Sequence, residues 1–261
     1  MDYTIGLLEI QIGLDRDEDR MYTAFDDDSN GDIDVINFQT WVQQHRLKWG
    51  FVLVALFALL RAAQTLTWQQ GFGSLDFRET LPFALFLLLW FVLLSVVLVG
   101  GGIVWLTHTS WAQLGWRRKG LLKAIGLGLL GFVLLYINVI AWALLEGNTT
   151  QPTTFTPGPV RLLLVACFAF GLPAWVEENL YRGYLQPLLA GRMSLGLAIV
   201  VQAAVFSVAH LGYYTHLLDF GMVAVTGLIL GWLRKRDASL VGPYVAHGLF
   251  WLTFAFMSVP T

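Results

Sequence analysis

Long apolar stretches separated by short polar segments dominate the chain after residue 48. Seven such stretches predict helices near residues 49–65, 81–107, 120–146, 160–190, 194–215, 217–234 and 238–258. A helix needs about 20 residues to cross a hydrocarbon layer of ~30 Å, and most of these stretches come close to that length. The pattern therefore predicts an all-α, polytopic transmembrane helix bundle of about seven helices.

The amino-acid composition supports this interpretation. Hydrophobic residues make up 56% of the 261 residues and the mean hydropathy is +0.63, whereas soluble domains contain roughly 45–50% apolar residues. A chain with this excess cannot bury all of its apolar surface within itself, so lipid is expected to cover the remainder. We therefore expect an integral membrane protein that has membrane lipid as a partner.

Acidic residues gather near the N-terminus. Eleven of the 18 Asp and Glu residues lie in the first 34 positions, although the net charge of the chain is only −2. This segregation predicts two regions, a small cytoplasmic helix-loop-helix at residues 1–48 and a transmembrane domain at residues 49–261. Lys and Arg form short clusters beside apolar stretches rather than one face of a polar helix, which argues against nucleic acid as a partner.

The basic clusters also predict the orientation in the membrane. If the seven helices alternate in direction, four clusters fall on one side: Arg46/Lys48, Arg117–Lys119, Arg192 and Arg234–Arg236. Because cytoplasmic loops carry an excess of Lys and Arg, this side is expected to be cytoplasmic. The N-terminus is then cytoplasmic and the C-terminus lies on the opposite side.

An acidic loop near the N-terminus matches the Ca²⁺ loop of an EF-hand, with Gly31 where the loop turns sharply. The expected ligands are Asp26, Asp28, Asn30, Asp32 and Asn37. Asn37 stands where such loops have a bidentate glutamate, so one charge and one ligand oxygen are lost and weak Ca²⁺ binding is expected. A polar turn that joins two short helices without binding an ion is the alternative.

Three charged residues interrupt the apolar stretch at residues 160–190. A charge at the centre of a membrane helix costs roughly 2.5–3.5 kcal/mol on the insertion scale. Glu178 and Arg182 lie four residues apart, so an ion pair is expected to offset part of this penalty. Glu177 points in another direction around the helix and lacks this partner. A desolvated carboxylate is a stronger base, which makes Glu177 the candidate general base, and a packing network or a transport path is the alternative.

Two histidines lie in later apolar stretches. His210 ends the segment FSVAH and His247 begins the segment HGLFW. A single histidine in a membrane helix is usually a packed, hydrogen-bonding residue. Two histidines at a depth comparable to that of the three charged residues permit one polar pocket between the helices.

These three segments, in this order, resemble the CAAX prenyl endopeptidase and bacteriocin-processing (CPBP) family of intramembrane proteases, whose pattern is EExxxR, FxxxH and HxxxN. The resemblance covers about residues 160–258, the expected core of the family. It implies that Glu177 and His210 together activate a water molecule. It also implies that Glu178 and Arg182 brace their helix.

In the same resemblance, His247 donates a hydrogen bond to the carbonyl oxygen as that oxygen becomes anionic. Trp251 stands where the family has asparagine, so the second donor to the oxyanion is altered. Loss of one such donor lowers a rate by about 10²–10³-fold.

The resemblance implies a hydrolase, an intramembrane endopeptidase that cleaves a peptide bond near the cytoplasmic membrane face. The expected substrates are prenylated or other hydrophobic C-terminal peptides, and Ca²⁺ at the N-terminal loop is the expected modulator. No cofactor is expected for catalysis, and zinc is disfavoured because a His-Glu-x-x-His pair is missing. The alternative is a non-catalytic membrane scaffold or a bacteriocin-immunity-like protein that keeps the polar pocket for binding.

Overall fold

The computed structural model describes residues 35–67, 80–147, 159–211 and 216–257. The chain divides into two units, Met1–Phe38 and Gln39–Thr261. Of the first unit, only residues 35–38 are described, as the start of a helix. The predicted Ca²⁺ loop up to residue 34 therefore lies outside the described residues, and the predicted helix-loop-helix stays a prediction.

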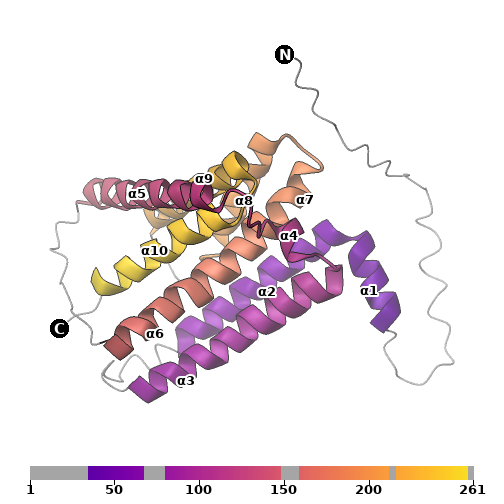
Figure 1. The fold of residues 1–261 in the computed structure, drawn as a ribbon, viewed down its shortest axis with the longest axis horizontal. Coiled ribbons are helices and arrows are strands. Elements are labelled where there is room, and N and C mark those ends of the chain that lie inside the picture. Colours follow the sequence, from indigo (N-terminus) through magenta and orange to yellow (C-terminus); the bar gives the residue numbers. More distant parts are fainter. Residues whose placement is uncertain (1–34, 68–79, 148–158, 212–215, 258–261) are drawn as a thin grey trace, which may run out of the picture. The chain divides into compact units, whose positions relative to one another are not determined.

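The described residues form helices joined by short turns (Figure 1). In chain order they are α1 (Val35–Gln44), α2 (Arg46–Thr67), α3 (Thr80–Trp90), η3 (Phe91–Trp105), α4 (Trp111–Leu114), α5 (Leu121–Leu145), α6 (Pro159–Ala169), η4 (Phe170–Leu185), α7 (Gln186–Ala190), α8 (Leu195–Val208), α9 (Leu217–Asp237) and α10 (Val241–Met257). The η segments are π-helical, with hydrogen bonds between residues five apart. For example, the N–H of Gln186 donates to the carbonyl of Tyr181.

All seven predicted helices are present, and two details differ from the prediction. Helix α8 ends at Val208 rather than near residue 215. It ends early because the N–H of His210 donates to the carbonyl of Ser207, three residues back, which tightens the last turn. The short helix α4 was not predicted, and it begins with a capping box formed by Ser110 and Gln113.

Five segments within the described ranges are long and apolar enough to cross a membrane: Arg46–Thr67, Ala84–Trp105, Leu121–Leu145, Leu162–Ala190 and Leu217–Asp237. Helix α8 has 14 residues, or about 21 Å, which is shorter than the hydrocarbon layer. The outer face of α5 is apolar, with Leu122 87% and Leu144 73% exposed, and a continuous apolar face of this kind requires lipid rather than water. The chain is an all-α polytopic helix bundle of an integral membrane protein, as predicted.

Helix α10 connects the two sides of the bundle, because it packs against α5 and also against η4. On one side, α3 packs against α6, and α2 packs against η3 and η4 (Figure 1). On the other side, α9 packs between α5 and α8. The larger hydrophobic core surrounds η4 and includes Leu98, Leu180 and Phe206, whereas a smaller core joins Leu135 to Leu233. The charged part of η4 therefore lies within the bundle.

Polar contacts and close backbone approaches join neighbouring helices. The side chain of Asn138 donates from Nδ2 to the carbonyl of Met222 at 3.0 Å, which connects α5 to α9. Trp49 donates from Nε1 to the carbonyl of Gly102 at 2.9 Å, which connects α2 to η3. A Cβ atom at Gly102 would lie 2.7 Å from Leu53 Cδ2, so glycine permits this approach. Small residues and buried polar groups are typical of contacts between membrane helices.

Candidate active site

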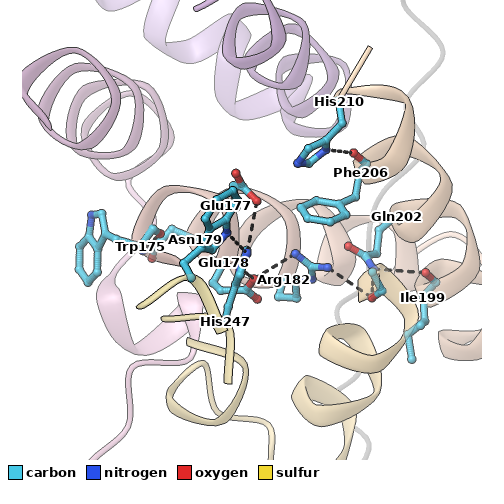
Figure 2. A network of polar contacts seen from close by, with 12 residues as sticks. Trp175, Glu177, Glu178, Asn179, Arg182, Ile199, Gln202, Phe206, His210 and His247 are labelled. Carbon is cyan, nitrogen blue, oxygen red and sulfur yellow. Dashed lines mark hydrogen bonds and ion pairs between the residues drawn. The ribbon is translucent and has the colours of Figure 1, made fainter. Parts of the chain in front are cut away.

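The five predicted catalytic residues meet in one buried cluster (Figure 2). Glu177, Glu178 and Arg182 come from η4, His210 follows the end of α8, and His247 belongs to α10. Each of the five side chains is at most 8% exposed. The fold thus brings together the polar side chains of three apolar segments that are far apart in the sequence.

The ion pair expected within η4 is present. Arg182 Nη1 donates to Glu178 Oε1 at 3.1 Å, and both side chains are completely buried. The guanidinium also donates from Nη2 to the carbonyl of Gly227 at 3.3 Å, and its Cζ lies 4.3 Å from the centroid of the Phe206 ring. Because a buried charge that loses its partner is strongly destabilising, these contacts hold η4 firmly against α8 and α9.

The carbonyl of Gly227 is an acceptor shared by two helices. Gln202 of α8 donates to it from Nε2 at 2.9 Å, beside the bond from Arg182. A Cβ atom at Gly227 would lie 2.9 Å from Ala203 Cα, so glycine lets the backbone of α9 reach the cluster. Neither residue was predicted from the sequence to belong to the site. Gln202 was detectable as a polar residue in an apolar stretch, whereas no sequence signal marks Gly227.

Both ring nitrogens of His247 have partners. Nδ1 lies 2.7 Å from Glu178 Oε1, and Nε2 accepts the indole N–H of Trp251 at 3.0 Å. An indole N–H can only donate, so Nε2 carries no proton, and the proton lies on Nδ1, where it is donated to the carboxylate. This tautomer follows from the partners of the ring rather than from observed hydrogens. In this arrangement Nε2 has no proton to donate to an oxyanion.

Glu177 differs from its neighbours in lacking donors. Its side chain is 1% exposed, and neither carboxylate oxygen has a hydrogen-bond partner among the described residues. Oε2 lies 3.8 Å from His247 Nε2, and the carboxylate is close enough to His210 for the two to interact electrostatically. Figure 2 shows the carboxylate between the rings of His210 and His247. A buried carboxylate in this position offers two acceptor oxygens to a water molecule or to a substrate N–H.

Phe206 forms the apolar centre around which the polar side chains pack. His210 Nδ1 lies 2.7 Å from the carbonyl oxygen of Phe206, so Nδ1–H donates to it and a neutral ring carries its lone pair on Nε2. The Phe206 ring has edge contacts with Tyr181, His210 and His247, at centroid distances of 5.0, 4.7 and 6.4 Å. The phenylalanine of the FxxxH segment therefore sets the spacing between the two histidines.

A small pocket lies beside His210, between α2 and the end of α8. Its lining includes Phe57, Arg61 and Thr65 from α2 together with Ala209–Leu211. Arg61 acts electrostatically on His210, and its Nη1 donates to Gln64 one turn later. Sequence analysis did not assign α2 to the site, although an arginine within an apolar span is the kind of signal that marks a functional position.

Tyr181 is a further polar residue that sequence analysis did not single out. Its side chain is completely buried and its hydroxyl has no hydrogen-bond partner among the described residues. It lies one turn from Glu177 on η4 and interacts with it electrostatically. A buried hydroxyl without a partner costs about 1–3 kcal/mol, so a contact with water or substrate would remove a penalty. Tyrosine carries no charge and has a largely apolar ring, so it does not stand out in an apolar stretch.

The predicted Ca²⁺ ligands cannot be placed beside this site. Asp26, Asp28, Asn30 and Asp32 lie outside the described residues, and Asn37 belongs to α1 but its side chain is not described. Within the described ranges, no group of three or more His, Cys, Asp or Glu side chains is arranged to hold a metal ion. The Ca²⁺ site stays a prediction.

Comparison with known proteins relates the cluster to one family. Residues 158–253 match the family described as type II CAAX prenyl endopeptidase Rce1-like. The matched segment covers less than half of the chain, and it contains all five predicted catalytic residues and Trp251. Searches among curated proteins and among solved structures found no match. This membrane helix bundle thus contains a segment similar to the type II CAAX prenyl endopeptidases, which supports the CPBP family.

Proposed function

We propose that this chain is an intramembrane endopeptidase in which Glu177 and His210 activate a water molecule for attack on a peptide bond. The observation that carries the proposal is the Glu177 carboxylate, which is buried beside two histidines and has no hydrogen-bond partner among the described residues. Glu178, which braces the helix, has partners on Oε1, whereas neither oxygen of Glu177 has one among the described residues. The similarity of residues 158–253 to a family of endopeptidases supports the same class of reaction.

In the proposed reaction, the water molecule lies between Glu177 and His210. Glu177 takes one proton from the water while the water oxygen attacks the carbonyl carbon, which gives a tetrahedral intermediate with a negatively charged oxygen. The bond between carbon and nitrogen then breaks, and Glu177 passes its proton to the departing amine. General base catalysis of this kind contributes about 10²–10⁴-fold to a rate.

His210 orients the water in this proposal. Its Nδ1–H is held by the carbonyl of Phe206, so the neutral ring presents Nε2 as an acceptor for the second hydrogen of the water. Glu178 and Arg182 hold the position of η4 through their contacts with α9 and α10. Support of this kind keeps a catalytic side chain within the narrow geometric range that a reaction needs.

The proposed substrate is a prenylated or otherwise hydrophobic C-terminal peptide. The pocket beside His210 supports lateral access from lipid, because Leu211 lines it and is 63% exposed. A lipid-anchored peptide that approaches between α2 and α8 would meet His210 first. Weak Ca²⁺ binding by residues 26–37, with an effect on the membrane domain, is part of the same proposal.

One observation favours a second candidate function, a non-catalytic membrane scaffold or immunity protein that binds a peptide in the same pocket. Trp251 occupies the position of the family's asparagine and donates to Nε2 of His247, which removes both expected donors to an oxyanion. Under this alternative, peptide binding persists but no peptide bond is hydrolysed. Both functions predict that a variant without the Glu177 charge binds the peptide less well, so a binding assay does not separate them. Detection of cleaved peptide does separate them, because only the endopeptidase forms it.

The test uses the purified full-length chain in lipid nanodiscs. It is incubated with a synthetic peptide that carries a prenylated cysteine near its C-terminus, and with the same peptide lacking the prenyl group, and products are identified by mass spectrometry. The wild type and the control Glu146→Gln, an exposed glutamate after α5, are expected to yield new peptide ends. Glu177→Gln is expected to yield almost none. Equal cleavage by Glu177→Gln overturns the mechanism, and binding without cleavage by the wild type supports the scaffold.

A further inference from the structure

A continuous chain of hydrogen bonds runs from α10 into η4. Trp251 Nε1 donates to His247 Nε2 at 3.0 Å, His247 Nδ1 donates to Glu178 Oε1 at 2.7 Å, and Arg182 Nη1 donates to the same oxygen at 3.1 Å. The direction of the chain is fixed by its two ends, because indole and guanidinium groups only donate and a carboxylate only accepts. The imidazole between them has a single proton arrangement that satisfies both neighbours.

We infer that Trp251 is a positioning residue that holds His247 in its neutral Nδ1–H tautomer. An asparagine at residue 251 would not impose this, because its amide has both a donor and an acceptor and can satisfy either tautomer. The tryptophan indole can only donate, so it permits only the Nδ1–H tautomer of His247. The inference about the tautomer stands on the geometry alone, and only its effect on the rate rests on the proposed function.

The indole is held in place to make this bond. Residues 247 and 251 lie four apart on α10, so their side chains lie on the same face of the helix. The ring of Phe168 on α6 meets the Trp251 ring edge-on at a centroid distance of 6.2 Å, and the ring of Phe250 lies 6.4 Å away. Aromatic neighbours on two sides restrict the rotation of the indole, so its N–H points steadily at His247.

The tautomer of His247 determines whether Glu177 receives a hydrogen bond from that ring. Its Oε2 lies 3.8 Å from His247 Nε2, close enough that a proton on Nε2 would attract the carboxylate into a hydrogen bond. Trp251 occupies that nitrogen with its own N–H, and both oxygens of Glu177 remain without a hydrogen-bond partner among the described residues. Trp251 therefore keeps Glu177 available to water, and His247 serves to orient Glu178 rather than to donate to an oxyanion.

The tautomer is measured by nitrogen NMR of the full-length chain labelled with ¹⁵N-histidine in nanodiscs. The chain has five histidines, and the signals that vanish in His247→Gln identify His247. The wild type is expected to show a protonated Nδ1 and an unprotonated Nε2. In Trp251→Phe an aromatic ring remains at residue 251 but the indole N–H is lost. The ratio of the two His247 tautomers is therefore expected to shift toward Nε2–H by about 2- to 10-fold, the range that corresponds to one hydrogen bond.

A matched control is available on α5. Trp142 Nε1 donates to Asn138 Oδ1 at 2.9 Å, so Trp142→Phe removes an indole hydrogen bond of the same spacing at another place, and the His247 signals are expected not to change. If the NMR spectrum of the wild type shows that His247 carries its proton on Nε2, the inference is overturned, even if Trp251→Phe does not fold. An unchanged ratio in folded Trp251→Phe also overturns it. If the ratio shifts but no variant cleaves peptide, the proposed function fails while the positioning role stands.

Discussion

Replacement of Arg182 by methionine tests how strongly the cluster depends on its buried charges. Methionine keeps much of the side-chain volume, but it leaves the Glu178 carboxylate with only the proton from His247, and Gly227 loses one of its two donors. Both ionic side chains are completely buried, so solvent does not compensate the remaining charge. Breaking one side of a buried ion pair costs about 3–5 kcal/mol, and the free energy of unfolding is expected to fall by that amount.

The assay is reversible unfolding in mixed micelles with increasing sodium dodecyl sulfate, followed by tryptophan fluorescence. The double variant Glu178→Gln/Arg182→Met removes both charges and is expected to recover about 0.5–3 kcal/mol relative to Arg182→Met alone. Arg192→Met, at an exposed arginine, is the control and is expected to stay within about 0.5 kcal/mol of the wild type. A loss below about 1 kcal/mol for Arg182→Met, or no recovery in the double variant, would show that the cluster does not depend on this ion pair.

Three further predictions concern the surroundings of the site. Tyr181→Phe is expected to leave the free energy of unfolding unchanged or higher, because the hydroxyl has no hydrogen-bond partner among the described residues. Tyr184→Phe, which loses a 3.3 Å bond to the carbonyl of Arg46, should cost about 0.5–1.5 kcal/mol. Equal losses for the two variants in the same unfolding assay would contradict this prediction. Dialysis against a zinc-selective chelator at constant Ca²⁺ should leave the peptide cleavage rate within about twofold. Stoichiometric zinc that is needed for activity would instead make Glu177 a ligand. Calorimetric titration of the full chain should detect weak Ca²⁺ binding that Asp26→Ala/Asp28→Ala abolishes, and identical traces would leave the loop a polar turn.

Hydrophobic pattern located the helices well because lipid imposes a minimum length and requires every backbone group to be satisfied within its own segment. The stretch predicted at residues 120–146 is the helix Leu121–Leu145, for example. The pattern failed at the end of α8, where apolar residues continue past Val208 but a tight turn ends the helix. It also gave no sign of the π-helical form of η4, because an apolar stretch of this length is compatible with an α-helix and with a π-helix.

The sequence predicted those residues of the candidate site whose burial in a membrane helix has a large free-energy cost. Glu177, Arg182 and His247 stood out because ionisable groups are rare in membrane helices. The contacts that connect them could not be predicted, because they depend on which faces of the helices meet. Tertiary packing determines three of these features. They are the hydrogen bond from Trp251 to His247, the approach of the Gly227 carbonyl to the cluster, and the residues of α2 that line the pocket beside His210.

The role of Glu177 as the general base is tested by the cleavage rate of Glu177→Gln relative to that of the wild type. Glutamine has nearly the same shape as glutamate, but it cannot take a proton from water. We predict that kcat for the prenylated peptide falls by about 10²–10⁴-fold while KM changes little. A Glu177→Gln protein that hydrolyses the peptide at the wild-type rate would contradict this role.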